Sequence, residues 1–180
     1  MIGPNLLLRA PEPADIDIIF RWENDMSIWH LGNTLTPYSK FAIEQFVFNT
    51  DNDIFASKQL RLMIDWHSAE TATKTVGTID LFDFDPHNKR AGIGILIDES
   101  TRRKGFALEA LNLLITYCFK TLNLHQLYCN IEESNLESIS LFNKAGFTSC
   151  AVKKEWLQRD GIWTDELMFQ LINQGFGVRG

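Results

Sequence analysis

The stretch of sequence that decides the fold is Arg90–Ala107, which reads RAGIGILIDESTRRKGFA. Residues 90–98, rich in Ile and Gly, predict a strand, and the apolar residues that follow Gly105 recur at helical spacing as far as Lys120. A strand, a basic turn and a helix therefore come in immediate succession. The N-terminus of a helix exposes free backbone N–H groups and the positive end of the helix dipole, so it attracts anions.

The turn carries the cations Arg102, Arg103 and Lys104 directly before Gly105. Cations at a helix N-terminus are unfavourable to the dipole, and a bound pyrophosphate would explain why three of them gather here. Gly105 would let a phosphate approach the backbone closely because it has no Cβ. A solvated basic turn before a helix that begins with glycine is the alternative explanation.

Upstream of this stretch, the pattern predicts strands that pair antiparallel, because short polar connections join them. The predicted strands are 6–9, 59–65 and 75–82, with a polar connection at 67–75 and a turn at 85–88. Helical spacing of apolar residues predicts a helix from about Pro13 to Glu23 and another from Ser39 to Phe48. Residues 24–38, between these helices, are predicted to be a loop or a broken helix.

Downstream, residues 126–131 predict a short strand, and Ser134–Glu137 has the pattern of a capping box that starts a helix ending at Gly146. Asp160-Gly161 predicts a hairpin turn between strands at 148–157 and 163–172. The element order is roughly βααβββαβαββ. We therefore expect an α+β fold with a mixed, mostly antiparallel sheet and about four helices, in one domain over residues 1–180 with a core at about 90–147 and a C-terminal hairpin at about 148–172.

Composition excludes several classes of protein. The net charge is −6 and no dense Lys/Arg block occurs, so tight nucleic-acid binding is not expected. No secretory signal or membrane span is predicted, because no apolar stretch approaches the roughly 20 residues that cross a bilayer. The three cysteines lack a CxxC pair and predict reduced thiols in the cytoplasm. The four histidines lie far apart without ligand spacing, so no metal is assigned.

Taken together, the motifs resemble the GNAT N-acetyltransferase superfamily. That family carries a Gln/Arg-x-x-Gly-x-Gly/Ala signature between its fourth strand and third helix, and here Arg102–Ala107 reads RRKGFA. Leu127–Ile131 resembles the family's fifth strand, while Asn135, Ser138 and Lys144–Phe147 resemble the N…S…K-x-GF signature of its fourth helix. The LLLR start, the NLHQLY segment and the hairpin that contains Trp163–Leu167 resemble the branch of spermidine/spermine and ribosomal-protein alanine acetyltransferases.

The resemblance implies that the sheet opens between its fourth and fifth strands and that acetyl-CoA lies in the opening. Backbone groups of Ile95, Leu96 and Ile97 would pair with the pantetheine arm, and an N–H near Ile97 would polarise the thioester carbonyl. The other residues implied in cofactor binding are Arg102, Arg103, Lys104, Gly105, Phe106, Ala107, Asn135, Phe142 and Lys144. For Asn135 the alternative is a helix cap, and for Lys144 it is a solvated helix face.

Two positions depart from the family's pattern. Many relatives place a tyrosine on the fourth helix to protonate the thiolate, and the aligned residue here is Phe142, which has no proton to give. Relatives in this branch often carry a glutamate early in the fourth strand, where this chain has Gly92. Asp80, Asp98, Glu132 and Glu133 are substitutes for that base, and Asp80 and Glu133 are preferred. A plain surface carboxylate is the alternative for each of these two.

For the acceptor, Trp163, Asp165 and Glu166 would hold a cationic amine by charge and by a cation–π contact. Adjacent strand residues face opposite ways, so only one of the two acids is expected to point into the site. The resemblance implies transfer of acetyl from acetyl-CoA to a primary amine of a polyamine, a peptide N-terminus or a small metabolite. Relatives often dimerise, so the resemblance also makes a homodimer a possible partner state. The alternative is a non-catalytic acyl-CoA-binding module, while a nucleotide-binding protein is excluded because no GxxxxGK[ST] or GxGxxG motif occurs.

Overall fold

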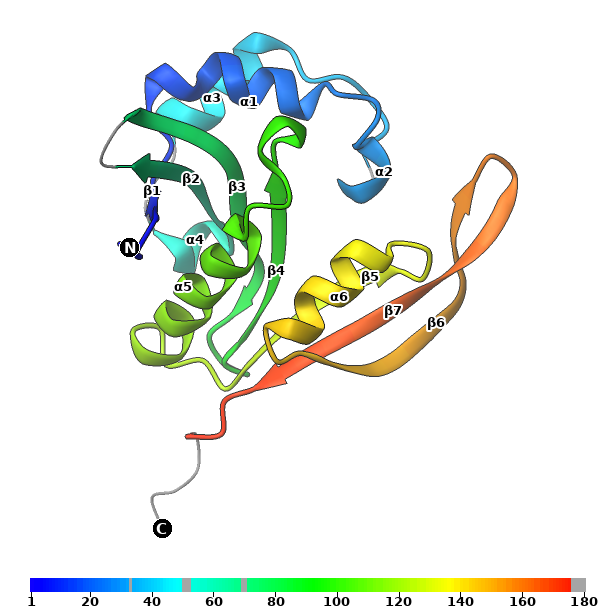
Figure 1. Cartoon of the computed structure of the whole chain (residues 1–180). Coiled ribbons are helices and arrows are strands. Elements are labelled where there is room, and N and C mark those ends of the chain that lie inside the picture. The colour runs from blue at the N-terminus through cyan, green and yellow to red at the C-terminus, as the bar shows by residue number, and fades with distance from the viewer. Residues whose placement is uncertain (33, 50–52, 69–70, 176–180) are drawn as a thin grey trace. The chain divides into compact units, whose positions relative to one another are not determined.

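A computed structural model describes residues 1–32, 34–49, 53–68 and 71–175. The chain forms two compact units (Figure 1). The larger unit combines Met1–Arg9 with the chain from Ile54 onward, and the smaller unit is Ala10–Asp53. The prediction of one domain over the whole chain stays a prediction, and each unit is described by itself.

Within the described residues, the larger unit contains one seven-stranded sheet in the order β1-β2-β3-β4-β5-β7-β6. The strands are β1 (Leu6–Arg9), β2 (Leu60–Ser68), β3 (Thr71–Asp85), β4 (Arg90–Ile97), β5 (Gln126–Glu132), β6 (Thr148–Arg159) and β7 (Ile162–Ile172). Every neighbouring pair is antiparallel except β4 and β5, which are parallel. The predicted α+β fold with a mixed, mostly antiparallel sheet is confirmed.

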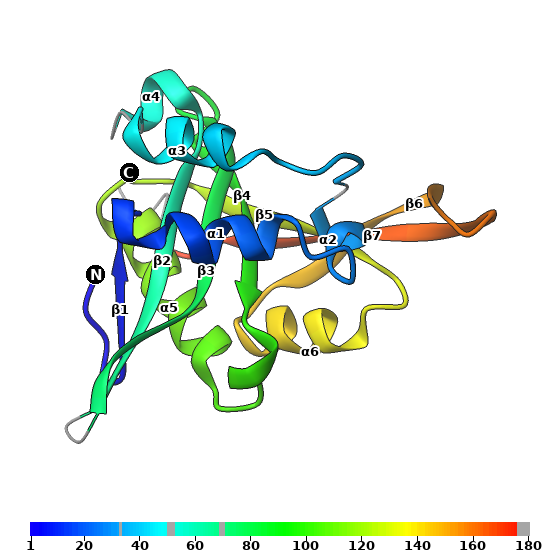
Figure 2. The same ribbon diagram turned by 90° about the horizontal axis from the view of Figure 1, so that it is seen from above.

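Helices α5 (Phe106–Lys120) and α6 (Leu136–Lys144) lie on the same face of this sheet (Figure 2). Leu111 of α5 and Phe142 of α6 belong to one buried core with Ile93 and Leu127, which alternate along β4 and β5 with residues of the opposite face. The shorter helices of this unit are α4 (Ile54–Ser57) and the 3₁₀ turn η2 (Glu99–Thr101). No helix in the described part of the chain is long and apolar enough to cross a bilayer.

The smaller unit is helical. It contains the 3₁₀ turn η1 (Pro13–Asp15) and the helices α1 (Ile16–Glu23), α2 (Trp29–Gly32) and α3 (Lys40–Phe48). Ser39 caps α3 by accepting a hydrogen bond from the backbone N–H of Ala42. Lys40 pairs with Asp17 of α1 at 2.6 Å. The two helices predicted in this region are confirmed, and the expected broken segment contains the single turn α2.

The predicted hairpin at the end of the chain is confirmed. Asp160 and Gly161 have φ values of 49° and 82°. Both are positive, as the tight turn that matches the twist of two antiparallel strands requires. The polar connection predicted at 67–75 is wrong, because β2 continues to Ser68 and β3 already begins at Thr71. Its polar threonines lie in the strand that pairs with β2, and residues 69–70 lie outside the described part.

The capping box predicted at Ser134 is also wrong. Asn135 is the N-cap of α6, and its side-chain oxygen accepts from the N–H of Ser138 at 3.1 Å. Ser134 instead donates its hydroxyl to Glu132 at 2.9 Å. The chain offers two adjacent residues that can cap a helix, and the turn after β5 selects the second of them.

Candidate active site

The candidate site begins where β4 and β5 separate. They pair only over Arg90–Gly92 and Gln126–Tyr128, although both strands continue beyond that point. Figure 1 shows β4 and β5 diverging from this short contact. The sheet therefore opens between its fourth and fifth strands, as predicted.

Alternation along β4 decides which backbone groups face this opening. The N–H of Asp98 donates to the carbonyl of Val76 in β3 at 2.8 Å. Backbone groups alternate in direction along a strand, so those of Leu96 also point toward β3 and those of Ile95 and Ile97 point into the opening. Of the three backbone positions predicted to face the pantetheine arm, Leu96 therefore faces the neighbouring strand instead.

The N-terminus of α5 lies at the end of the turn that follows β4. Gly105 is its N-cap with a φ of 83°, and it offers no side chain to cap the helix. The first N–H groups of α5, those of Phe106, Ala107 and Leu108, have no partner within the helix. Arg103, two residues earlier, also has a positive φ of 64°. Successive N–H groups in such a left-handed and right-handed alternation form a concave anion site.

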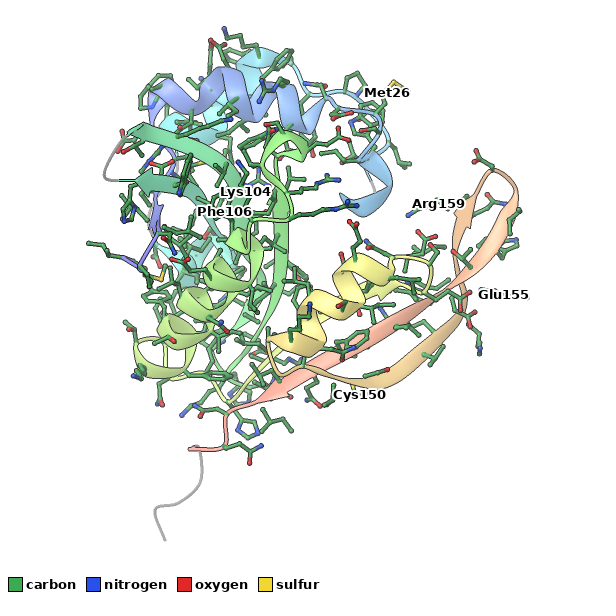
Figure 3. The ribbon with its side chains drawn as sticks, in the orientation of Figure 1. Met26, Lys104, Phe106, Cys150, Glu155 and Arg159 are labelled. Atoms are coloured by element: carbon green, nitrogen blue, oxygen red, sulfur yellow. The ribbon has the colours of Figure 1, made fainter. Side chains whose placement is uncertain are left out.

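The basic side chains of this turn differ in what they contact. Nε of Arg102 donates to the carbonyl of Ile97 at 3.2 Å. Arg103 lies 3.5 Å from Glu137, with side chains that are 88% and 76% exposed, so this pair holds it weakly. Nζ of Lys104 lies 5.6 Å from the centre of the Trp66 ring. Figure 3 labels Lys104 at the N-terminal end of α5. All three cations lie in the turn directly before that end of the helix.

The predicted residues of α6 are spread over the helix. Phe142 is only 4% exposed and packs edge-on against Phe147, with ring centres 5.1 Å apart. Its ring belongs to the core, in agreement with the absence of a hydroxyl. Asn135 uses its side-chain oxygen as the N-cap of α6, the alternative role expected for it. Lys144 is exposed in the last turn of the helix.

Packing explains why β4 has no carboxylate at Gly92. A Cβ at this position would lie 2.2 Å from Cε2 of Phe82, so the phenyl ring occupies the space that a side chain would need. The same ring meets Tyr128 of β5 edge-on at 5.9 Å. The Tyr128 hydroxyl donates to Asp83 at 3.0 Å. Burial, followed by this hydrogen bond, raises the pKa of Tyr128 to about 12, which keeps the phenol protonated.

The two preferred bases have different surroundings. Asp80 accepts two hydrogen bonds from Arg61, at 2.9 and 3.1 Å, so its carboxylate already has a bidentate cationic partner. Glu133 follows β5, and its carboxylate lies 3.5 Å from the N–H of Asp165. Their roles as bases stay predictions. In the described residues no three His, Cys, Asp or Glu side chains group as metal ligands.

The hairpin acids predicted to hold an amine are both paired with lysines. Lys153 contacts Glu166 at 2.6 Å, and Glu166 is among the few buried charged residues. Lys154 donates to Asp165, and this hydrogen bond lowers the pKa of that carboxyl. Trp163 is exposed. The two acids face opposite sides of the sheet, as neighbours in a strand must.

The sequence ranked Glu132 below Glu133 as a candidate base, and the strand register decides on which face of the sheet Glu132 lies. Directly opposed residues of a sheet share a face, so Gly92 and Tyr128 lie on the face away from α5 and α6. Glu132 lies four residues after Tyr128 and therefore on that same face, beside the opening. Counting alternate residues along β5 from a known neighbour of β4 would have placed it on this face.

The family model described as "Acetyltransferase (GNAT) domain" matches residues 5–148. This chain belongs to the GNAT acetyltransferase family. An uncharacterized N-acetyltransferase of Bacillus licheniformis, p20, is 28% identical over 172 residues, which are 95% of this chain and 94% of the relative. The spermidine N(1)-acetyltransferase of Vibrio cholerae is 26% identical over 149 residues, which are 81% of this chain and 80% of the relative.

Solved GNAT structures share the fold. A spermidine N-acetyltransferase of Vibrio cholerae, crystallised in complex with CoA and spermine, superimposes with a TM-score of 0.81 at 22% identity. The match covers 94% of this chain and 96% of that one. The family resemblance inferred from the motifs is thereby confirmed, together with its sheet that opens between β4 and β5.

Proposed function

We propose that this GNAT chain transfers an acetyl group from acetyl-CoA to a primary amine by direct attack. The observation that carries the proposal is the opening between β4 and β5, where the backbone groups of Ile95 and the N–H of Ile97 point away from β3. An extended arm that contains amides, such as pantetheine, can pair with such groups as a further strand would. The uncapped N-terminus of α5 follows η2 and the basic turn, and it suits the pyrophosphate at the far end of that arm.

In this proposal, each part of the chain has a separate task. The N–H groups of Phe106 and Ala107, with Arg103 and Lys104, hold the phosphates. The N–H of Ile97 donates to the thioester carbonyl oxygen as negative charge develops on it. Acetyl-CoA supplies the activated acyl group, and the acceptor amine supplies the nucleophile. Polyamines, peptide N-termini and small metabolite amines are the proposed acceptors, and the relatives that act on spermidine give polyamines the first place in a test.

The three cysteines are free thiols, which supports the cytoplasm as the proposed location. Association of two copies stays a proposal too. A non-catalytic acyl-CoA-binding module is the second candidate, and the buried Phe142, which lacks an acidic proton, is the observation that favours it.

Two glycines allow a matched test of the phosphate site. Gly105 and Gly161 have φ values of 83° and 82°, and at neither would a Cβ meet an atom within 4 Å. Gly105→Glu and Gly161→Glu therefore impose the same backbone strain and the same charge at two distant places. Calorimetry should show acetyl-CoA binding weakened about tenfold or more in Gly105→Glu alone, because the new carboxylate repels the phosphates. Equal binding in the two variants would contradict the proposed site.

The reaction itself is tested by CoA release with spermidine, short peptides and small amines. Release that depends on the amine, and that Gly105→Glu reduces, establishes the transferase and identifies its substrate class. Acetyl-CoA binding without release by any amine would favour the binding module.

A further inference from the structure

We propose that Glu132 accepts the proton of the acceptor amine. It takes the place of the glutamate that relatives often carry early in β4, where this chain has Gly92 and the Phe82 ring leaves no room for a side chain. This inference rests on the proposed function and names the base of that same site. It is drawn from the position of Glu132 at the end of β5, its partly buried carboxylate, and the partners of the other acids nearby.

The register of β4 and β5 places Glu132 level with the end of β4, where the proposed thioester carbonyl would lie. Gly92 and Tyr128 are the last residues that pair across β4 and β5. Leu96 and Glu132 each lie four residues beyond this pair, so Glu132 stands across the opening from the β4 segment that ends at Ile97. Its side chain lies on the face opposite α5 and α6. The phosphate site is at the N-terminus of α5, and in this proposal the acceptor enters from the face that carries Glu132.

Two side chains contact the carboxylate of Glu132 and leave it able to accept a proton. Its side chain is 14% exposed and lies 3.4 Å from Nε of Arg159. The Ser134 hydroxyl donates to its other oxygen at 2.9 Å. A carboxylate offers about four lone-pair sites, so both oxygens keep a free position for a proton. Other charged groups on this face include Glu166, opposite Glu132 in β7, and Lys153, which pairs with Glu166. Asp80, opposite Gly94, and its partner Arg61 lie on the same face.

The other acids are worse placed. Asp80 is held by Arg61 through two hydrogen bonds. Glu166 has Lys153 at 2.6 Å, so its carboxylate already holds an ammonium group of the chain. Glu133 is adjacent to Glu132 in sequence and therefore turns toward the other side, where it meets the backbone of Asp165.

The proton balance is simple. Glu132 takes one proton from the ammonium form of the acceptor, directly or through one water. The nitrogen lone pair then forms the N–C bond to the thioester carbonyl carbon, and the C–S bond breaks with its electron pair on sulfur. Solvent carries the second nitrogen proton to that sulfur, since Phe142 has none to give. The products are the N-acetyl amide and the CoA thiol, and the proton on Glu132 returns to solvent.

The test compares Glu132→Gln with Glu133→Gln, which changes the neighbouring carboxylate on the opposite side. We expect Glu132→Gln to lower kcat by about 10²-fold or more at neutral pH, a usual size for loss of a general base. Its acetyl-CoA affinity by calorimetry should not change. The loss should shrink as pH rises toward about 10, where amines deprotonate without help. Glu133→Gln tests the other candidate base, and Glu155→Gln, at an exposed residue of β6 outside the proposed site, should keep the kcat and the pH profile of the natural chain.

Three outcomes would overturn the inference. Equal activity of Glu132→Gln and the natural chain would exclude the role, and a loss that is the same at every pH would show that Glu132 only positions Arg159 or Ser134. A loss confined to Glu133→Gln would transfer the role to Glu133. Glu132→Asp, which keeps the carboxylate, guards against misfolding and should recover part of the rate. If none of the amines tested triggers CoA release by the natural chain, the proposed function itself fails and this inference fails with it.

Discussion

At the scale of single residues, Gly92 shows how packing replaces a functional group. The Phe82 ring takes the space beside β4, and a Cβ at Gly92 would lie 2.2 Å from it. Gly92→Ala should therefore lower the free energy of unfolding by about 1–3 kcal/mol, the usual cost of overpacking. Urea denaturation measures this loss. Gly94→Ala is the matched control on the same strand, because its nearest atom would be 3.9 Å away. Equal costs at both glycines would show that strand propensity, not the Phe82 ring, sets the penalty.

Tyr128 gives a prediction for alkaline pH. Burial and the hydrogen bond to Asp83 raise its pKa from an ordinary 10.0 to about 12. The unfolded chain therefore loses this proton first, so the stabilisation is complete below about pH 10 and disappears as pH rises toward 12. Tyr128→Phe should show a smaller loss of stability over that range, by chemical denaturation at several pH values. Tyr117, whose pKa burial also raises, stays in both proteins and contributes equally. Parallel stability curves for the two proteins would refute the role of Tyr128.

At the scale of elements, the sequence predicts what is local and misses what depends on contacts between elements. The start of α5 at Gly105 was predictable because a helical pattern, a glycine and a basic turn coincide within a few residues. The extension of β3 to Thr71 was not, since pairing with β2 overrides a polar sequence. The side of Glu132 depends on where β5 meets β4, and the Phe82 ring reaches Gly92 from another strand. The helix N-terminus of the candidate site was therefore predictable from local sequence, whereas the face of the sheet on which each acid lies was not.

One carboxylate fastens the first turn of α5 to β1. Glu109 accepts hydrogen bonds from the N–H groups of Asn5 and Leu6 and from the Asn5 side chain, at 2.8, 3.1 and 3.0 Å. Glu109→Ala should lower the free energy of unfolding by about 1–3 kcal/mol, because donors are left without a partner. Thermal and urea unfolding measure the effect. Glu137→Ala, in the first turn of α6 with an exposed partner, should change stability by about 0.5 kcal/mol or less. A similar loss in both variants would indicate a general helix-dipole effect.

At the scale of the whole molecule, the reaction rates of the cysteine thiols measure how often the folded protein opens. Cys118 and Cys129 are 0% and 2% exposed, and burial raises the pKa of Cys118 to about 12 and also raises that of Cys129. Cys150 is exposed on β6, and Figure 3 shows it nearer the base of the hairpin than Glu155 and Arg159. Since the thiolate is the reactive form, the buried pair can react only when the core opens.

Alkylation with iodoacetamide, followed by mass spectrometry, should therefore show one fast thiol and two slow ones in the native protein. Cys150→Ser should remove the fast phase and leave the slow phase unchanged, which also makes it the suitable background for colour assays of CoA release. Acetyl-CoA at about 100 times its Kd should slow the two buried thiols by up to about 100-fold, because a ligand that binds only the folded state adds about 2.7 kcal/mol of stability. Three thiols that react at one rate would contradict the buried positions of Cys118 and Cys129. A slow phase that acetyl-CoA does not change, in a protein that binds it, would mean that these thiols become exposed by local opening rather than by unfolding of the sheet that holds the ligand.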